Sequence, residues 1–231
     1  MNEMSAGPRT LVSRPEPTAA PNHEALVEEL AQPQEALVRA AYRLIGSKGI
    51  ERTTLQDIAD AAGVSKALAV YYFKTKENIL LAAIRWVLGR VAERMTGVVD
   101  SVEAPEEKVY AMVDAIFVDP RRNRDFYLAY TALIGEAARN ERFNELNVTF
   151  KSIMNAAYAD LIRSGEGTVF VVDSVEEAAM GVRALIDGLF MQWLEESDWI
   201  ASHDRYKARC ARAILRYLGV AEEPSSPGDA T

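Results

Sequence analysis

The stretch TTLQDIADAAGVSKALAVYYF, residues 53–73, predicts two short helices joined by a tight turn. Thr54 and Asp57 have the spacing of a capping box, so the first helix is expected to begin there. Gly63 is expected to end it, because glycine adopts the left-handed conformation of a helix end at the least cost. Ser65 can then cap the second helix. Two short helices joined in this way are typical of a helix-turn-helix.

The second helix is expected to bury one face and to expose the other. Ala69 and Phe73, four residues apart, are predicted to point inward. Ser65 and Lys66 lie at its N-terminus, where free backbone N–H groups and the helix dipole favour a phosphate oxygen. A lysine that only solvates the surface is the alternative.

The remaining outward side chains of this helix predict contacts with a DNA duplex. Ala67 and Leu68 are short enough for close approach in the major groove, where they can touch a thymine methyl group but cannot read a hydrogen-bonding pattern. Tyr71 and Tyr72 can each place a hydroxyl group on a phosphate. The alternative for both tyrosines is a half-buried core position with a solvated hydroxyl group.

The charge balance restricts where nucleic acid can bind. The chain of 231 residues has 26 Lys and Arg against 34 Asp and Glu, a net charge of −8, which argues against binding polyanions over the whole surface. Residues 34–80 instead hold seven basic and five acidic side chains, a local excess of +2. A small DNA-binding head on an acidic body requires this segregation.

The distribution of prolines and apolar residues predicts four segments. Residues 1–33 hold five of the nine prolines and predict a mobile N-terminal tail, and residues 220–231 predict a mobile C-terminal tail. Helical periodicity dominates between them, so the predicted fold class is all-α: a three-helix helix-turn-helix domain at 34–80, then an effector-binding and dimerisation bundle at 81–219. The expected helices are 34–48, 54–63, 65–73, 75–98, 106–118, 123–139, 141–163, 174–196 and 200–218.

Residues 53–59 and 63–66, followed by residues 72–80, resemble the N-terminal domain of tetracycline-repressor (TetR) family regulators. Tyr72 directly before Phe73 resembles the choline-responsive, betaine-pathway branch of that family. The resemblance implies an all-helical homodimer whose head binds double-stranded operator DNA and whose body binds a small-molecule effector. By this resemblance, the expected DNA contacts are Thr54, Ser65, Lys66, Tyr71, Tyr72 and Lys76.

The predicted helix 75–98 links these two functions. Lys76 at its start is expected to contact a phosphate, whereas Trp86 lies in the body. At ~1.5 Å per residue the helix spans on the order of 35 Å. If a ligand moves this rod, the recognition helices of a dimer lose the ~34 Å separation that successive major grooves require. The resemblance therefore predicts a repressor that a small molecule releases from its operator.

Aromatic and sulfur-containing side chains on the body helices are candidates for the effector pocket, because clustered aromatic rings can enclose a cation or an apolar ligand. An ordinary core position is the alternative for each of them. Arg183 and Asp187, four residues apart, can hold a polar ligand or form an ion pair. The pocket candidates are Trp86, Phe117, Tyr127, Tyr130, Met154 and Tyr158.

The last two predicted helices, 174–196 and 200–218, are expected to form the dimer contact. Their apolar faces are wider than one core stripe needs, and paired helices from two chains give a four-helix interface with two-fold symmetry. Packing within one chain is the alternative. The predicted interface residues are Val182, Leu185, Leu189, Trp193, Ala213 and Tyr217.

No residue pattern indicates an enzyme, a metal site or a cofactor. His23 and His203 have no evident catalytic partner, and Cys210 falls on an apolar helix face, where an inert thiol is usual. One cysteine and no apolar run near ~18 residues predict a cytoplasmic protein without a membrane span. We expect a ligand-responsive DNA-binding transcriptional regulator; the alternatives are a helical small-molecule-binding protein that has lost DNA binding, and an enzyme.

Overall fold

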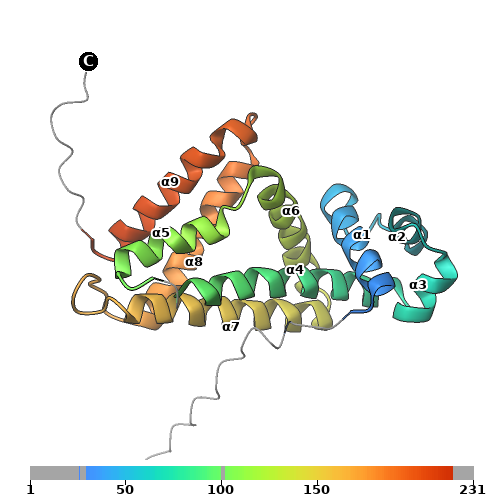
Figure 1. Cartoon of the computed structure of the whole chain (residues 1–231), viewed down its shortest axis with the longest axis horizontal. Coiled ribbons are helices and arrows are strands. Elements are labelled where there is room, and N and C mark those ends of the chain that lie inside the picture. The colour runs from blue at the N-terminus through green and yellow to red at the C-terminus, as the bar shows by residue number, and fades with distance from the viewer. Residues whose placement is uncertain (1–25, 27–29, 100–101, 221–231) are drawn as a thin grey trace, which may run out of the picture.

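The computed structural model describes residues 26, 30–99 and 102–220, which form a helical head and a helical body (Figure 1). The predicted all-α class is confirmed. Most of the predicted tails, 1–33 and 220–231, lies outside the described residues. The helices are α1 (Gln32–Lys48), α2 (Leu55–Ala62), α3 (Lys66–Phe73), α4 (Lys76–Val99), α5 (Pro105–Ile116), α6 (Pro120–Ala137), α7 (Glu141–Arg163), α8 (Val175–Leu194) and α9 (Trp199–Tyr217).

The head, α1 to α3, has the local structure that its sequence predicts. The Thr54 hydroxyl group accepts from the backbone N–H of Asp57, whose carboxylate accepts from the backbone N–H of Thr54 in return. Gly63 ends α2 in the left-handed conformation, with φ 70°. Ala69 and Phe73 are buried, and they fix α3 against the other two helices of the head.

The helix α4 joins the head to the body. It packs against α1 at its head end, and α7 runs beside it in the body (Figure 1). The helix α6 crosses from the body to α1, and α8 packs between α7 and α9. A single connected set of buried apolar side chains runs through both parts, so the head is not separated from the body by a solvated linker.

Four helices, α1, α5, α6 and α9, begin earlier than predicted, and the first three have a proline in the first turn. Pro33 lies in the first turn of α1, Pro105 begins α5, and Pro120 begins α6 after the cap formed by Asp119. Proline fits the first turn because the N–H group that it lacks would have no partner within the helix there. Pro33, which was assigned to the N-terminal tail, therefore belongs to the start of a helix, as do Pro105 and Pro120.

Leu26 lies inside the segment that was predicted to be a mobile tail, yet it is buried. Its carbonyl oxygen packs against Gly89 of α4, where an added Cβ would lie 3.1 Å from that oxygen.

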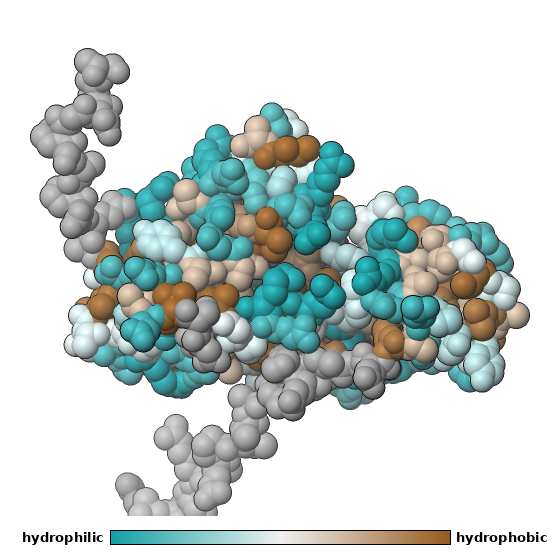
Figure 2. Space-filling model, viewed as in Figure 1, coloured by the Kyte–Doolittle hydropathy of each residue, from teal (hydrophilic) through white to brown (hydrophobic). Residues whose placement is uncertain are grey.

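In the view of Figure 2, hydrophilic side chains cover much of the body, and apolar ones gather in small patches on body and head. Within the described ranges, no helix has the length and apolar character that a membrane span requires.

Candidate DNA-binding face and effector pocket

The outer face of α3 presents the side chains that were predicted to contact DNA. The Ser65 hydroxyl group caps the helix by accepting from the backbone N–H of Leu68 at 3.2 Å. Lys66 and Ala67 are exposed, and Leu68 is half-buried. The face therefore offers a helix N-terminus with a lysine beside it, as phosphate binding requires.

Tyr71 and Tyr72 lie edge to face on this helix, with ring centroids 5.2 Å apart. Tyr71 is 68% exposed, which excludes the core alternative for it, whereas Tyr72 is half-buried against the core. Lys74, which the sequence interpretation did not single out, lies over the Tyr71 ring with its Nζ 5.3 Å from the centroid. Its φ of 64° ends α3 and turns the chain toward α4.

Thr54 and Lys76 make contacts within the head. The Thr54 hydroxyl group donates to the Asp57 carboxylate at 2.8 Å in addition to capping α2. The Lys76 ammonium group donates to the carbonyl oxygen of Glu51 at 2.9 Å, so it holds the loop between α1 and α2. Both residues shape the surface that would meet a duplex.

A cavity of about 320 Å³ lies where the body meets α1 of the head, and α4, α5, α6, α7 and α8 contribute the rest of its wall. Five of the six predicted pocket residues line it: Trp86, Tyr127, Tyr130, Met154 and Tyr158. Phe117 does not, which corrects that part of the prediction. It leaves the end of α5 toward the core and stacks on Phe190 of α8, with ring centroids 4.2 Å apart.

The sequence interpretation missed three further aromatic residues that line the cavity: Tyr42, Phe126 and Phe150. Phe126 stacks on Tyr130, with ring centroids 5.8 Å apart, and Tyr42 meets the edge of Trp86 at 6.1 Å. Burial raises the pKa of Tyr130 to about 12, although Arg183 opposes this shift. The tyrosine hydroxyl groups therefore stay protonated and act as neutral hydrogen-bonding groups.

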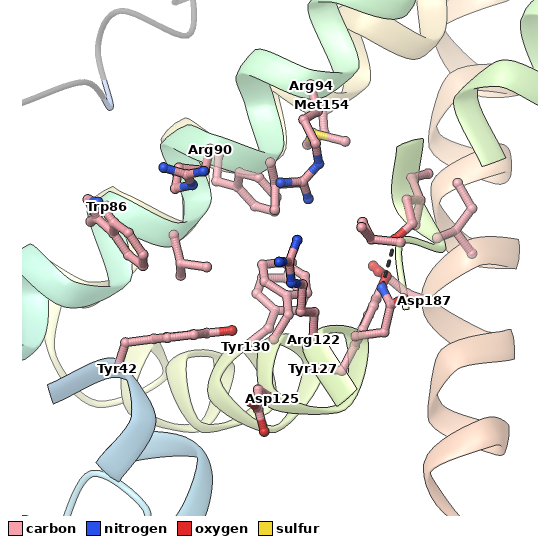
Figure 3. A pocket seen from close by; sticks show the side chains of 18 of the residues that line it. Tyr42, Trp86, Arg90, Arg94, Arg122, Asp125, Tyr127, Tyr130, Met154 and Asp187 are labelled. Atoms are coloured by element: carbon pink, nitrogen blue, oxygen red, sulfur yellow. Dashed lines mark hydrogen bonds between the residues drawn. The ribbon is translucent and has the colours of Figure 1, made fainter. Parts of the chain in front are cut away.

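The cavity wall also carries charged side chains (Figure 3). Arg183 and Asp187 form the expected ion pair at 3.3 Å, and Arg183 also donates to the Tyr130 hydroxyl group. Burial raises the pKa of Asp187 despite the attraction of Arg183. The other charged residues of the wall, which the sequence interpretation missed, are Arg39, Arg90, Arg94, Arg122 and Asp125.

Two residues of the predicted dimer contact are buried inside the subunit. Val182 is 2% exposed and Trp193 is 0% exposed, and the Trp193 ring N–H donates to the carbonyl oxygen of Trp199 at 2.7 Å. A partner subunit cannot reach either side chain. The structure therefore removes Val182 and Trp193 from the predicted interface, because both are buried in the core of the subunit.

The opposite face of α8 and the adjoining side of α9 remain accessible. Leu185, Leu189 and Ala213 are half-buried, and Tyr217, which is 46% exposed, lies over Gly181. Additional exposed residues extend this α8/α9 face: Met180, Ala184, Gly188 and Met191.

Comparison with known proteins identifies the family to which this chain belongs. Residues 37–83 match the model of bacterial regulatory proteins of the tetR family, and residues 105–219 match the C-terminal domain of BetI-type transcriptional repressors. The regulator BetI of Rhizobium meliloti (strain 1021) is 34% identical over 163 residues, which cover 69% of this chain and 76% of that protein. The chain belongs to the tetR family of bacterial regulatory proteins.

Further relatives agree with this assignment. BetI of Agrobacterium fabrum is 34% identical over 160 residues, 69% of this chain and 75% of that protein. A transcriptional regulator from Saccharomonospora viridis, solved in complex with choline, has a TM-score of 0.71 and 25% identity, covering 80% of this chain and 96% of that one.

The resemblance stated from residues 53–80 is therefore confirmed, and the C-terminal domain is of the BetI type. The protein is a DNA-binding transcriptional repressor that responds to a small-molecule effector. Regulators of this family are not enzymes, as the sequence predicts.

Proposed function

We propose that this tetR-family protein is a cytoplasmic homodimer, and that a small molecule in the body cavity releases it from its operator. The observation that carries the proposal is the position of α4. Its first residue, Lys76, holds a loop of the head, and Trp86, Arg90 and Arg94 further along the same helix line the cavity. One continuous helix therefore contacts both functional parts.

Occupation of the cavity would act through this helix. The α4 side chains form one wall, and α6, α7 and α8 supply much of the rest, so a ligand that separates these walls displaces α4. Lys76 and α3 then move with it, because α3 and α1 pack against α4. Release needs a ligand that binds the displaced arrangement more tightly than the DNA-bound one, typically by ~1–3 kcal/mol of coupling.

The dimer contact in this proposal is the exposed α8/α9 face. It is apolar and lies away from α3, so two subunits joined there leave both recognition helices free for DNA. Such a contact joins the same surface of both chains around a two-fold axis, as most soluble homodimers do.

DNA contacts are proposed for the outer face of α3 and the residues beside it: Thr54, Ser65, Lys66, Ala67, Leu68, Tyr71, Tyr72 and Lys76. Lys74 joins them because it is exposed next to Tyr71. Most of these groups suit phosphate contacts, so they would set the position on the duplex more than they read its sequence.

Footprinting of the DNA upstream of its own gene tests the proposal, followed by salt-dependent titration of the protected site. Lys66→Ala should weaken binding and flatten the slope of log affinity against log salt by about one unit. Lys151→Ala, an exposed lysine on α7 of the body, is the matched control and should leave the slope unchanged. Equal slopes for Lys66→Ala and the wild type would refute the assignment of α3 as the DNA-binding surface.

The choline in the Saccharomonospora viridis structure makes a quaternary ammonium ion the first ligand class to compare with this cavity. Aromatic rings, which bind such cations, line the wall. The charged side chains of the cavity wall, however, indicate a different class of ligand.

A further inference from the structure

The charged lining of the cavity is unbalanced. Five arginines line it against two aspartates, Asp125 and Asp187. Asp187 is paired with Arg183, and the Asp125 carboxylate points away from Arg94 and Arg122 (Figure 3). The charge of Asp187 is therefore already compensated by an arginine, and Asp125 is not placed between Arg94 and Arg122.

Two of the arginines lie on α4 without a carboxylate partner among the described residues. Arg39 pairs with Glu35 at 2.7 Å, and Arg122 pairs with Asp119 at 3.2 Å. Arg90 instead lies over the Trp86 ring at 5.4 Å, and Arg94 donates from Nε to the carbonyl oxygen of Ala115 at 3.3 Å. The terminal nitrogens of Arg94 thus remain available to a ligand.

Arg94 lies in a cluster of like charges. Its guanidinium group extends from α4 and that of Arg122 from α6, and the two point toward one another across the cavity (Figure 3). Burial lowers the pKa of Arg94, and the neighbouring charges of Arg90 and Arg122 lower it further. An anion between these groups would replace repulsion with attraction, and guanidinium groups bind carboxylates with two parallel hydrogen bonds.

A further donor lies on the α8 side of the cavity. Nη1 of Arg183 is buried and has no hydrogen-bond partner within the part of the chain that the structure describes. An unpaired buried donor is costly, so a ligand oxygen that reaches it gains binding energy. Apolar and aromatic side chains fill the wall between the charged groups: Val87, Val91, Ile116, Phe126, Met154 and Ile186.

We propose that the effector of this regulator is an amphipathic carboxylate, whose anionic group lies between Arg94 and Arg122 and whose apolar body lies against the aromatic wall. The inference rests on the ligand-released regulator proposed above and names its ligand class. A quaternary ammonium ion would instead meet Arg90 and Arg94, which have no carboxylate partner among the described residues.

Isothermal titration of the full chain tests this with three carboxylates, octanoate, phenylbutyrate and indoleacetate, and with choline and phenylbutylamine as cations. At least one carboxylate should bind about tenfold more tightly than either cation, as expected for one charge-assisted contact. Choline binding as tight as that of the best carboxylate would overturn the proposal, and so would failure of all three carboxylates to bind at millimolar concentration.

Variants at Arg94 locate the anion site. Arg94→Gln should weaken binding of the best carboxylate by about tenfold, and Arg94→Lys, which keeps the charge but not the forked donor, by less. Arg85→Gln is the matched control, because Arg85 is exposed on the same helix and does not line the cavity. Equal affinities of Arg94→Gln and Arg85→Gln would overturn the site, and thermal unfolding of each variant checks that it folds.

Operator titration separates this inference from the proposed function. A carboxylate that binds through Arg94 but leaves operator affinity unchanged would refute ligand-driven release and support the charge assignment. Release by choline alone would keep the ligand-released regulator and overturn the anionic effector.

Discussion

Nη1 of Arg142 in α7 lies 2.8 Å from Oε1 of Glu77 in α4, at the point where the head meets the body. The other terminal nitrogen of Arg142 donates to the Asn78 side chain at 3.0 Å, so one guanidinium group holds the first turn of α4. Both charged side chains are about half exposed, and exposed ion pairs contribute only ~0.2–1 kcal/mol to stability. The contact therefore orients the head more than it stabilises the fold.

Arg142→Gln should consequently separate stability from DNA binding. Urea unfolding should change by less than ~1 kcal/mol. Operator affinity should fall by roughly two- to fivefold, because a head that is less well oriented must be ordered on binding. Arg163→Gln is the control, since Arg163 pairs with Asp160 and Glu176 at the other end of α7 and is similarly exposed. If both variants weaken operator binding equally, the contact has no orienting role.

Two glycine-to-alanine changes should alter stability in opposite directions. Gly63→Ala should destabilise the protein by about 1–2 kcal/mol, because Gly63 has φ 70° at the turn between α2 and α3. Gly97→Ala should stabilise it by up to about 1 kcal/mol, because Gly97 lies within α4 and an added Cβ would meet nothing within 4 Å. Thermal unfolding of both variants measures the difference, and a stable Gly63→Ala variant would contradict the turn geometry.

The Arg183–Asp187 pair should show strong coupling in a double-mutant cycle. Arg183→Met should cost about 1–3 kcal/mol, because it leaves the partly buried carboxylate of Asp187 without its partner. The double variant Arg183→Met/Asp187→Leu should lie closer to the wild type than the sum of the single variants. Additive single effects would show that the two side chains do not interact.

The cost of Arg183→Met should also depend on pH. Burial already raises the pKa of Asp187, and loss of Arg183 should raise it further. A raised carboxyl pKa means that the folded state holds the proton more tightly, so lower pH favours folding. The destabilisation should therefore shrink as pH falls below neutrality, and urea unfolding at several pH values measures this.

Stability should decline in alkaline solution. Burial raises the pKa of the Cys210 thiol from 9.0 to about 12, and burial also raises the pKa values of Tyr127 and Tyr158. Above about pH 9 the unfolded chain loses these protons while the folded chain retains them, so folding stability falls by up to about 1.4 kcal/mol per pH unit for each group. Urea unfolding of the wild type and Cys210→Ala should show a shallower decline for the variant. Identical slopes would mean that Cys210 is accessible to solvent.

Ala184→Arg tests the proposed dimer. Ala184 is exposed on the α8/α9 face, so a long charged side chain there should leave the subunit folded and separate two subunits. Light scattering should detect a dimer for the wild type and a monomer for the variant. Ala138→Arg, at an exposed position after α6, should stay dimeric. A monomeric wild type at micromolar concentration would refute the dimer itself.

The helix-turn-helix was predictable from sequence because its signals are local. The Thr54 and Ser65 caps and the left-handed Gly63 act within three or four residues along the chain. The cavity was predictable only in part. Trp86 and Tyr130 line it as predicted, but Phe117 and Phe126 belong to similar helical patterns, and only Phe126 faces the cavity.

By itself the sequence determined the helices, the head with its exposed recognition helix, and the family of regulators to which the chain belongs. Tertiary structure decided which side chains share the cavity, because Arg94, Arg122 and Arg183 come from three helices far apart in the chain. It also decided that Val182 and Trp193 are internal. Caps and turns depend on hydrogen bonds between near neighbours, whereas the burial and pairing of a charge depend on which distant helices pack around it.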